Sequence, residues 1–267
     1  GVELLLGYNI INNSEMVWNT SLFASKNENK LVSLIDDLDT LVYYQTNSGN
    51  VNSQAKVGGG IGDLYGNVWE RDSSGNRIVD ADGKPTVSNP DNLLGNAQPD
   101  WLAGWSNSFF YKNFSLNVLI DGRFGGVVYS GDSSRLDAFG VSERSLQYRE
   151  SGVVLDAVDS NGAANTVSIT GQEYWQRLSD IAEPYVYAQD NVRLRELAIG
   201  YSFPDVSALG MESVSLQLIG RNLFFINKKA EDIDPEAALG TNLGGQGIAL
   251  GNLPTLRSIG LNVTLRF

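Results

Sequence analysis

Alternating apolar and polar positions recur along this chain, and they are clearest in its last nine residues. The apolar positions are Ile259, Leu261, Val263, Leu265 and Phe267, and small or polar residues stand between them. Because a strand projects successive side chains to opposite faces, one face of this segment is apolar and the other is polar. The pattern therefore predicts a strand whose apolar face needs cover up to the final residue.

The same alternation predicts about seven strands in all, and the connections between them alternate in length. Four of the six earlier strands are expected at 2–10, 16–25, 101–110 and 114–123. The fifth is expected to end at 203, and the sixth to begin at 213. Short polar turns are expected at 12–14, 111–113 and 204–205, and long polar stretches at about 27–99, 125–185 and 227–254. Compact domains seldom hold loops beyond about 15 residues. Outer-membrane barrels combine short periplasmic turns with long extracellular loops, which favours a transmembrane antiparallel β-barrel over a soluble sandwich or propeller with insertions.

Aromatic residues gather near both ends of the predicted strands. Trp18, Phe109 and Tyr111 lie beside the short turns, and Trp101 and Phe124 lie beside the long connections. Aromatic rings collect at the two interfaces of a bilayer. The alternative is that aromatic residues simply favour strands, but that preference does not account for clusters at both ends.

One predicted strand changes phase. Val192 and Leu194 are out of step with Leu197 and the apolar positions that follow it. Either a β-bulge lies near Arg195-Glu196, or the strand rises above the bilayer and places Arg193 and Arg195 near the anionic lipid surface. The sequence leaves both alternatives open.

Composition narrows the functional classes. The 267 residues include neither Cys nor His, which removes disulfides, thiol chemistry and the commonest general base and metal ligand. A net charge of −12 makes nucleic acid a poor partner. No apolar run reaches 18 residues, so a transmembrane helix is excluded. Asp36, Asp37 and Asp39 have no recognisable partner, and we expect no catalytic, cofactor or metal residues.

Local motifs have simple structural explanations. The glycines of 58–62 lack the Lys-Ser/Thr of a phosphate loop. The segments 72–75 and 80–83 resemble calcium loops but lack the distal Glu, and Asx turns are the better interpretation. The acidic segment 232–236 could bind a cation, although a solvated turn is favoured. Thr170-Gly-Gln-Glu173 is a capping box, which predicts a helix near 174–182 that folds over the barrel mouth.

Three aromatic residues of the long stretches are candidates for substrate contact. Tyr65, Trp69 and Trp175 could stack on flat ligand faces such as sugar rings. The alternative is that they pack the loops against each other.

The chain also resembles the carboxyl-terminal part of the SusC/RagA family of TonB-dependent outer-membrane transporters of the Bacteroidetes. The resemblance rests on matching segments that occur in order at 1–4, 94–101, 107–114, 121–126, 192–197, 200–204, 220–223, 234–236 and 254–257. It implies that residues 1–267 supply roughly the last seven strands of a 22-stranded plugged barrel, with the plug domain and earlier strands upstream. The chain opens inside an apparent strand without an initiator Met, and we expect it to be a piece of a longer protein.

The resemblance further implies import of a large nutrient, a glycan or a peptide, with energy supplied through TonB. It implies a SusD-like surface lipoprotein as a lid, outer-membrane lipid and lipopolysaccharide as surroundings, and no enzymatic activity. The final strand, with Ile259, Leu261, Val263, Leu265 and Phe267, looks like the signal read by the barrel assembly machinery. The alternative from another class is a secreted soluble all-β carbohydrate-binding module.

Overall fold

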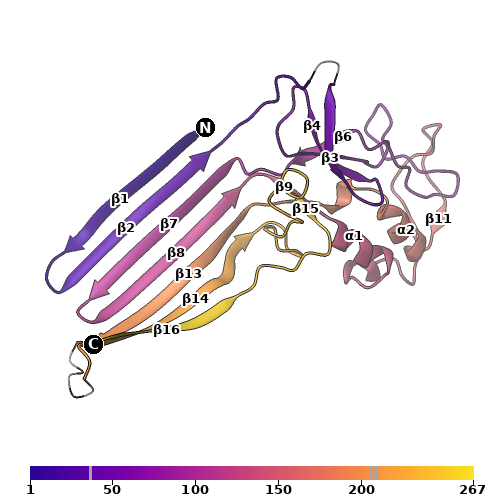
Figure 1. Ribbon diagram of the computed structural model, residues 1–267. Helices are drawn as coiled ribbons and strands as arrows, with labels where there is room; N and C mark the ends of the chain where they lie inside the picture. Colours follow the sequence, from indigo (N-terminus) through magenta and orange to yellow (C-terminus); the bar gives the residue numbers. More distant parts are fainter. Residues whose placement is uncertain (36–37, 205, 207, 209) are drawn as a thin grey trace.

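The computed structural model describes the whole chain except residues 36, 37, 205, 207 and 209. The acidic pair Asp36-Asp37 and the Asp205 position of the third expected turn lie outside the described residues. Two regions are evident in Figure 1: a long curved sheet, and a body of loops and short elements at one end of it.

The curved sheet, here called the wall, contains the seven strands that the alternation predicted (Figure 1). In sheet order they are β1 (Val2–Asn12), β2 (Met16–Lys26), β7 (Trp101–Tyr111), β8 (Phe114–Phe124), β13 (Asn191–Phe203), β14 (Ser213–Lys228) and β16 (Ser258–Arg266). All neighbours are antiparallel. The sheet begins at β1 and ends at β16 without closing, so the all-β fold is confirmed, and the 22-stranded closed barrel remains a prediction.

The apolar positions of neighbouring strands stand opposite one another. Leu116 of β8 pairs with Ile199 of β13, which pairs with Leu218 of β14, and Leu218 pairs with Leu261 of β16. Paired residues point to the same side of a sheet, so these residues share one face, here called the apolar face. The opposite side is the polar face, which carries Asn117 and other polar residues.

Two of the three short connections match their prediction. Residues 13–15 join β1 to β2, and Lys112 and Asn113 join β7 to β8. The third is longer than expected, because β13 ends at Phe203 and β14 begins at Ser213. Val206 and Met211 form an isolated bridge within it.

The three long stretches fold into a body with its own secondary structure, here called the cap. Its strands are β3 (Thr40–Gln45), β4 (Val51–Lys56), β5 (Asp63–Gly66), β6 (Asn92–Asn96), β9 (Val127–Ser130), β10 (Val153–Val154), β11 (Ser168–Ile169), β12 (Val186–Ala188) and β15 (Ile248–Ala249). β3 to β6 form one sheet, β12, β9 and β15 a second, and β10 and β11 a third. Each of the long stretches contributes elements to the cap.

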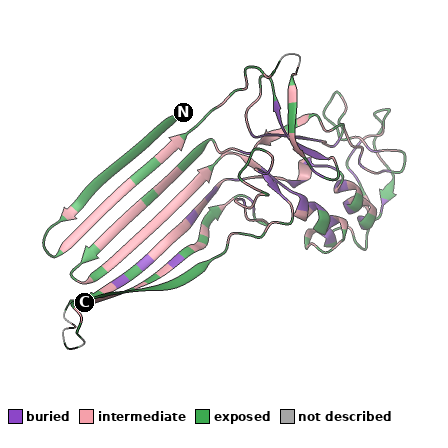
Figure 2. Ribbon diagram, in the orientation of Figure 1, coloured by how far each residue is buried: buried purple, intermediate pink, exposed green. Residues whose placement is uncertain are grey.

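The cap contains most of the buried residues, as Figure 2 shows, whereas the wall is mainly half-buried or exposed. One cluster is formed by Trp69, Val79, Leu155, Ala157, Ile169, Trp175, Leu178 and Ile181. A second is formed by Val51, Leu64, Ala97, Tyr129, Ala182, Tyr185 and Ile248. Residues from distant parts of the chain meet in both, so the cap is a packed structure and not a set of independent loops.

The capping box begins a helix, as the sequence predicted, but the helix starts at Gly171 and not near the expected residue 174. Helix α2 spans Gly171–Leu178, and the Thr170 hydroxyl accepts from the Glu173 amide while the Glu173 carboxylate accepts from the Thr170 amide. The helix ends before the expected residue 182, and a short 3-10 helix, η2 (Glu183–Tyr185), follows. Helix α1 (Gly131–Ala138) and the 3-10 helix η1 (Arg144–Leu146) complete the helical elements. No helix among the described residues is long and apolar enough to cross a membrane.

If the apolar face meets lipid, a charge on it should be costly. In the full-length protein, we expect Val263→Arg to destabilise the folded barrel by about 2–4 kcal/mol if the position lies near the bilayer midplane. Val263 is paired with Leu216 on the apolar face. The measurement is a denaturant titration in phospholipid vesicles.

The adjacent position provides a matched control. Asn262 pairs with Gln217 on the polar face, so Asn262→Arg should change stability much less. Equal losses for the two variants would contradict the assignment of the apolar face.

Candidate functional site

The phase change in β13 is a β-bulge at Arg195. In the pairing of β13 with β8, Leu194 opposes Ile120 and Glu196 opposes Leu119, so Arg195 has no opposing residue. The extra residue keeps Leu194 and Leu197 on the apolar face although they are three positions apart. The β-bulge, the first of the two alternatives from the sequence, is therefore confirmed, and the height of this part of β13 relative to a bilayer stays a prediction.

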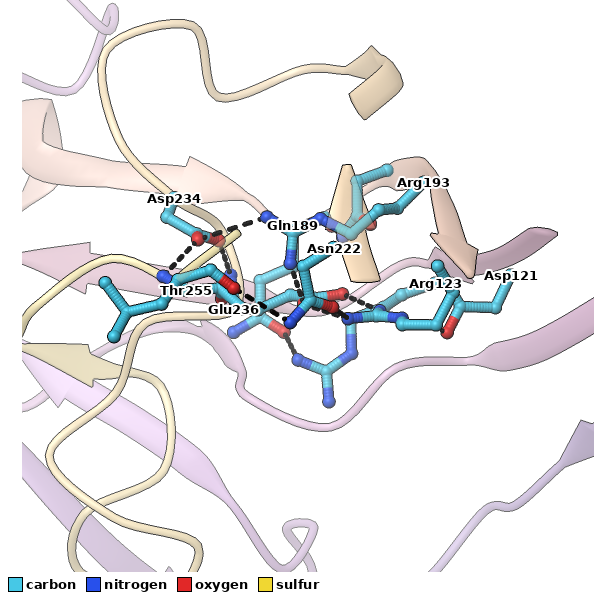
Figure 3. A network of polar contacts seen from close by, with 11 residues as sticks. Asp121, Arg123, Gln189, Arg193, Asn222, Asp234, Glu236 and Thr255 are labelled. Atoms are coloured by element: carbon cyan, nitrogen blue, oxygen red, sulfur yellow. Dashed lines mark hydrogen bonds and ion pairs between the residues drawn. The ribbon is translucent and has the colours of Figure 1, made fainter. Parts of the chain in front are cut away.

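Arg193 and Arg195 lie on the polar face, where they bind Asp234 and Glu236 of the third long stretch. Figure 3 shows this network of polar contacts, with Arg193, Asp234 and Glu236 labelled. Arg193 donates to Glu236 at 2.8 Å and forms an ion pair with Asp234 at 3.3 Å. Arg195 donates to Glu236 at 2.7 Å and to Asp121 of β8 at 2.7 Å. These five residues are here called the arginine latch. The latch joins two wall strands to one segment of the cap.

The latch is largely shielded from water. The side chains of Arg193 and Asp234 are 4% and 6% exposed. The Arg193 guanidinium also lies 3.8 Å from the centroid of the Phe225 ring, a cation–π contact that covers one face of the charge. A buried charge is tolerated only when it is paired, so the latch depends on all its members being present.

Hydrogen bonds keep the Asp234 carboxylate ionised. Burial acts to raise its pKa, but the backbone amides of Glu236 and Thr255 donate to it and Arg193 adds positive charge, so the pKa lies below its ordinary value. Asn222, which has φ 51°, links Arg195 to the backbone carbonyl of Leu256. The start of the final strand is therefore tied to the same latch.

The acidic segment 232–236 is not the solvated turn that the sequence favoured. Asp234 and Glu236 bind cations, but the cations are the guanidinium groups of Arg193 and Arg195. The described residues contain no group of three or more His, Cys, Asp or Glu side chains suited to a metal ion. The sequence could not reveal this pairing, because the partners lie about 40 residues apart in the chain.

A cavity of about 640 Å³ opens between α1 and α2 in the cap. Its lining combines the ring of Trp175 and the exposed Phe139 with amide and guanidinium groups from Gln172, Gln176 and Arg149. Aromatic rings with a few convergent polar groups are typical of small-ligand sites.

An ion pair with a buried carboxylate, Asp137, lies beside this cavity. Arg144 donates from Nε to Asp137 at 2.6 Å, and its guanidinium lies 4.9 Å from the Tyr185 ring and 5.5 Å from the Trp175 ring. Burial raises the pKa of Tyr185 far above its ordinary value, so its phenol remains neutral. Arg144 therefore contacts both helices, through Asp137 of α1 and the Trp175 ring of α2.

The three candidate aromatic residues from the sequence are all buried in the cap. Tyr65 is 7% exposed, Trp69 donates its indole N–H to the Ile78 carbonyl, and Trp175 donates to the Gln147 carbonyl. Trp69 and Trp175 belong to one hydrophobic cluster that joins the first and second long stretches, as the alternative interpretation held, whereas Tyr65 lies in β5 between two strands of the first stretch. Trp175 also lines the cavity between α1 and α2. A role for any of the three in substrate binding stays a prediction.

Two Asx turns are confirmed, and the structure adds a third. Asp72, Asp80 and Asp159 each accept hydrogen bonds from backbone amides two and four residues ahead. These carboxylates are occupied by the backbone and close short hairpins of the cap.

Comparisons with known proteins agree with this architecture. No model of a known protein family matches the chain. The chain is 24% identical to "TonB-dependent receptor P3" and 27% identical to "TonB-dependent receptor P26", both of Formosa agariphila. The alignments cover 100% and 99% of this chain but only 28% and 29% of those receptors, so the chain spans under a third of their length.

Solved structures give the same result for the fold. The chain superposes on a structure titled "Structure of the RagAB peptide transporter" with a TM-score of 0.66 and 18% identity, over 99% of this chain and 29% of that one. A related structure of the RagAB peptide importer in an "open-open" state gives a TM-score of 0.62 at 17% identity. The resemblance to SusC/RagA-like TonB-dependent transporters is thereby confirmed.

Removing one member of the latch should release the third long stretch. We expect Arg193→Met in the full-length protein to destabilise the segment 230–256 by about 3 kcal/mol, because Asp234 would then be buried without its cation. Hydrogen exchange of that segment measures the change. The control is Arg221→Met, whose exposed pair with Glu196 should contribute under about 1 kcal/mol. Equal exchange in both variants would show that the latch does not hold the segment.

Acid should weaken the arginine latch, because Asp234 loses its negative charge when it is protonated. The pKa of Asp234 is lower in the folded protein than its ordinary value of 3.8. The ionised carboxylate therefore stabilises the folded protein fully above pH 3.8, and this stabilisation is lost as pH falls through the pKa of the folded state. We expect protection of the segment 230–256 from exchange to be constant from pH 8 to 5 and to fall below about pH 4. The fall should be much smaller in Asp234→Asn, and an unchanged acid response in that variant would contradict this role.

Proposed function

We propose that this chain, which is SusC/RagA-like and similar throughout to TonB-dependent receptors, is part of an outer-membrane nutrient transporter. In this proposal residues 1–267 form the carboxyl-terminal part of the β-barrel, and a longer polypeptide supplies the plug domain and the earlier strands. The apolar face of the wall lies against lipid, and the cap lies on the extracellular side. The activity is transport and not catalysis.

One observation carries the proposal: the apolar face runs in phase across all seven wall strands and remains exposed. Ile259, Leu261 and Leu218 are 71%, 67% and 54% exposed. In water such a surface would favour aggregation, whereas in a bilayer lipid covers it. A secreted carbohydrate-binding module would need a second sheet over this face, and the described residues place none there.

The substrate we propose is a large nutrient, a glycan or a peptide, imported with energy supplied through TonB. TonB would act through the upstream region, and a SusD-like lipoprotein would close over the cap from outside. The cavity lined by Phe139, Gln172 and Gln176 offers rings and amide groups that suit either class of substrate. The RagAB structures are named as a peptide transporter and importer, which supports a peptide as one candidate substrate.

The final strand has a further role in this proposal. Ile259, Leu261, Val263 and Leu265 of β16, followed by Phe267, would form the signal recognised by the barrel assembly machinery. The apolar members of this set are all exposed on one face, and Phe267 is 82% exposed. That arrangement leaves them accessible to another protein before the barrel closes.

The first test is the mass and heat behaviour of the native polypeptide in the outer-membrane fraction. We expect a band well above 29.0 kDa that shifts in gel mobility on boiling, and growth on the cognate glycan or peptide that requires both this gene and TonB. A disrupted neighbouring SusD-like gene should reduce uptake in the same assay. A soluble native chain without a heat shift would refute the transporter and favour the secreted module.

A further inference from the structure

A groove of about 370 Å³ crosses the apolar face of the wall near its cap end. Its floor consists of three small residues that lie side by side in register: Ala24 of β2 pairs with Ala103 of β7, and Ala103 pairs with Gly122 of β8. Leu4 of β1 and Val192 of β13 continue the same row and close its two ends. The groove is thus a row across five strands in which the three central strands have little or no side chain.

Large side chains border the floor on both sides. Toward the middle of the wall, the next row contains Leu22, Trp105 and Ile120. Toward the cap, the next row contains Trp101 and Phe124. The Phe124 ring leans over the floor, since a Cβ atom added to Gly122 would lie 3.0 Å from it. The lining is almost wholly apolar.

A lysine, Lys26, stands at the cap-side border of the groove. Lys26 pairs with Trp101 on the apolar face, and its ammonium lies 5.8 Å from the centroid of that ring. Lys26 is exposed, and it has no ion pair among the described residues. Two positions along the strand, about 7 Å, separate this row from the groove floor.

We propose that the groove binds one acyl chain of lipopolysaccharide, with a phosphate of the lipid A headgroup at Lys26. This rests on the proposed function, because it requires the apolar face to lie in the outer membrane with the cap outside. The groove then faces the outer leaflet, and Trp101 and Phe124 stand at the level of the headgroups, where aromatic rings are favoured.

The dimensions and the charge select this occupant. A groove one row wide measures about 7 Å along the strands, too narrow for a helix of about 10 Å diameter but suited to a single hydrocarbon chain. The acyl chain would make apolar contacts along its length, and no polar group would have to be desolvated. The ammonium of Lys26, which has no ion pair among the described residues and stands one row from the groove floor, complements an anionic headgroup.

The test uses full-length protein purified in mild detergent, with bound lipid counted by native mass spectrometry against added lipid A. Ala103→Leu fills the floor with an apolar side chain, so the barrel should assemble normally. We expect it to weaken retention of lipid A about tenfold, the effect of losing contact with about two methylenes. Lys26→Gln should weaken retention of lipid A about fivefold. Dephosphorylated lipid A should bind equally to Lys26→Gln and to the unaltered protein.

The control is Val118→Phe, which enlarges a side chain on the same face of β8 outside the groove. It should retain lipid A as the unaltered protein does. Equal retention by Ala103→Leu and Val118→Phe, or equal binding of lipid A and phosphatidylethanolamine by the unaltered protein, would overturn the proposal. The heat shift of each variant shows separately whether the barrel has folded. A folded barrel that binds lipid A no better than the controls would refute the groove proposal alone, whereas the absence of a heat shift in the unaltered protein would refute the transporter proposal.

Discussion

The structure depends on keeping apolar side chains in phase across seven neighbouring strands. The side-chain period of a strand is two, so a slip of one residue would turn the apolar set of a strand to the opposite face. In this wall the register places Leu116, Ile199, Leu218 and Leu261 side by side, strand after strand. In lipid, the same pairing satisfies the backbone hydrogen bonds that the bilayer cannot satisfy. The strand register therefore determines both the pairing of the backbone and which side chains lie on the apolar face.

The bulge at Arg195 shows how this constraint produces a specific site. Near the cap, β13 must keep Leu194 and Leu197 on the apolar face although an odd number of steps separates them, and one unpaired residue solves that problem. The residues displaced to the polar face are charged, and they bind Asp234 and Glu236 of the third long stretch. An adjustment of strand phase thus also anchors the cap to the wall.

The cap follows different physical rules from the wall. It has two hydrophobic clusters, paired strands and Asx turns, as a soluble domain has. A packed cap can hold the cavity between α1 and α2 in a set shape, which separately moving loops could not do. The wall, in contrast, buries little within itself and leaves small rows such as Ala24, Ala103 and Gly122 open to its surroundings.

Local patterns in the sequence predicted the seven wall strands, two of the three short turns and the capping box that begins α2, because these depend on neighbours only two to four residues away. Alternation, turn residues and a capping box are local signals. Three features required the folded structure: the fold of the long stretches, the contact of the acidic segment 232–236 with Arg193 and Arg195, and the burial of Tyr65, Trp69 and Trp175. Those outcomes depend on contacts between residues far apart in the chain, such as Asn50 with Tyr129 across 79 positions. No local pattern encodes such a contact, since either partner alone resembles an ordinary loop residue.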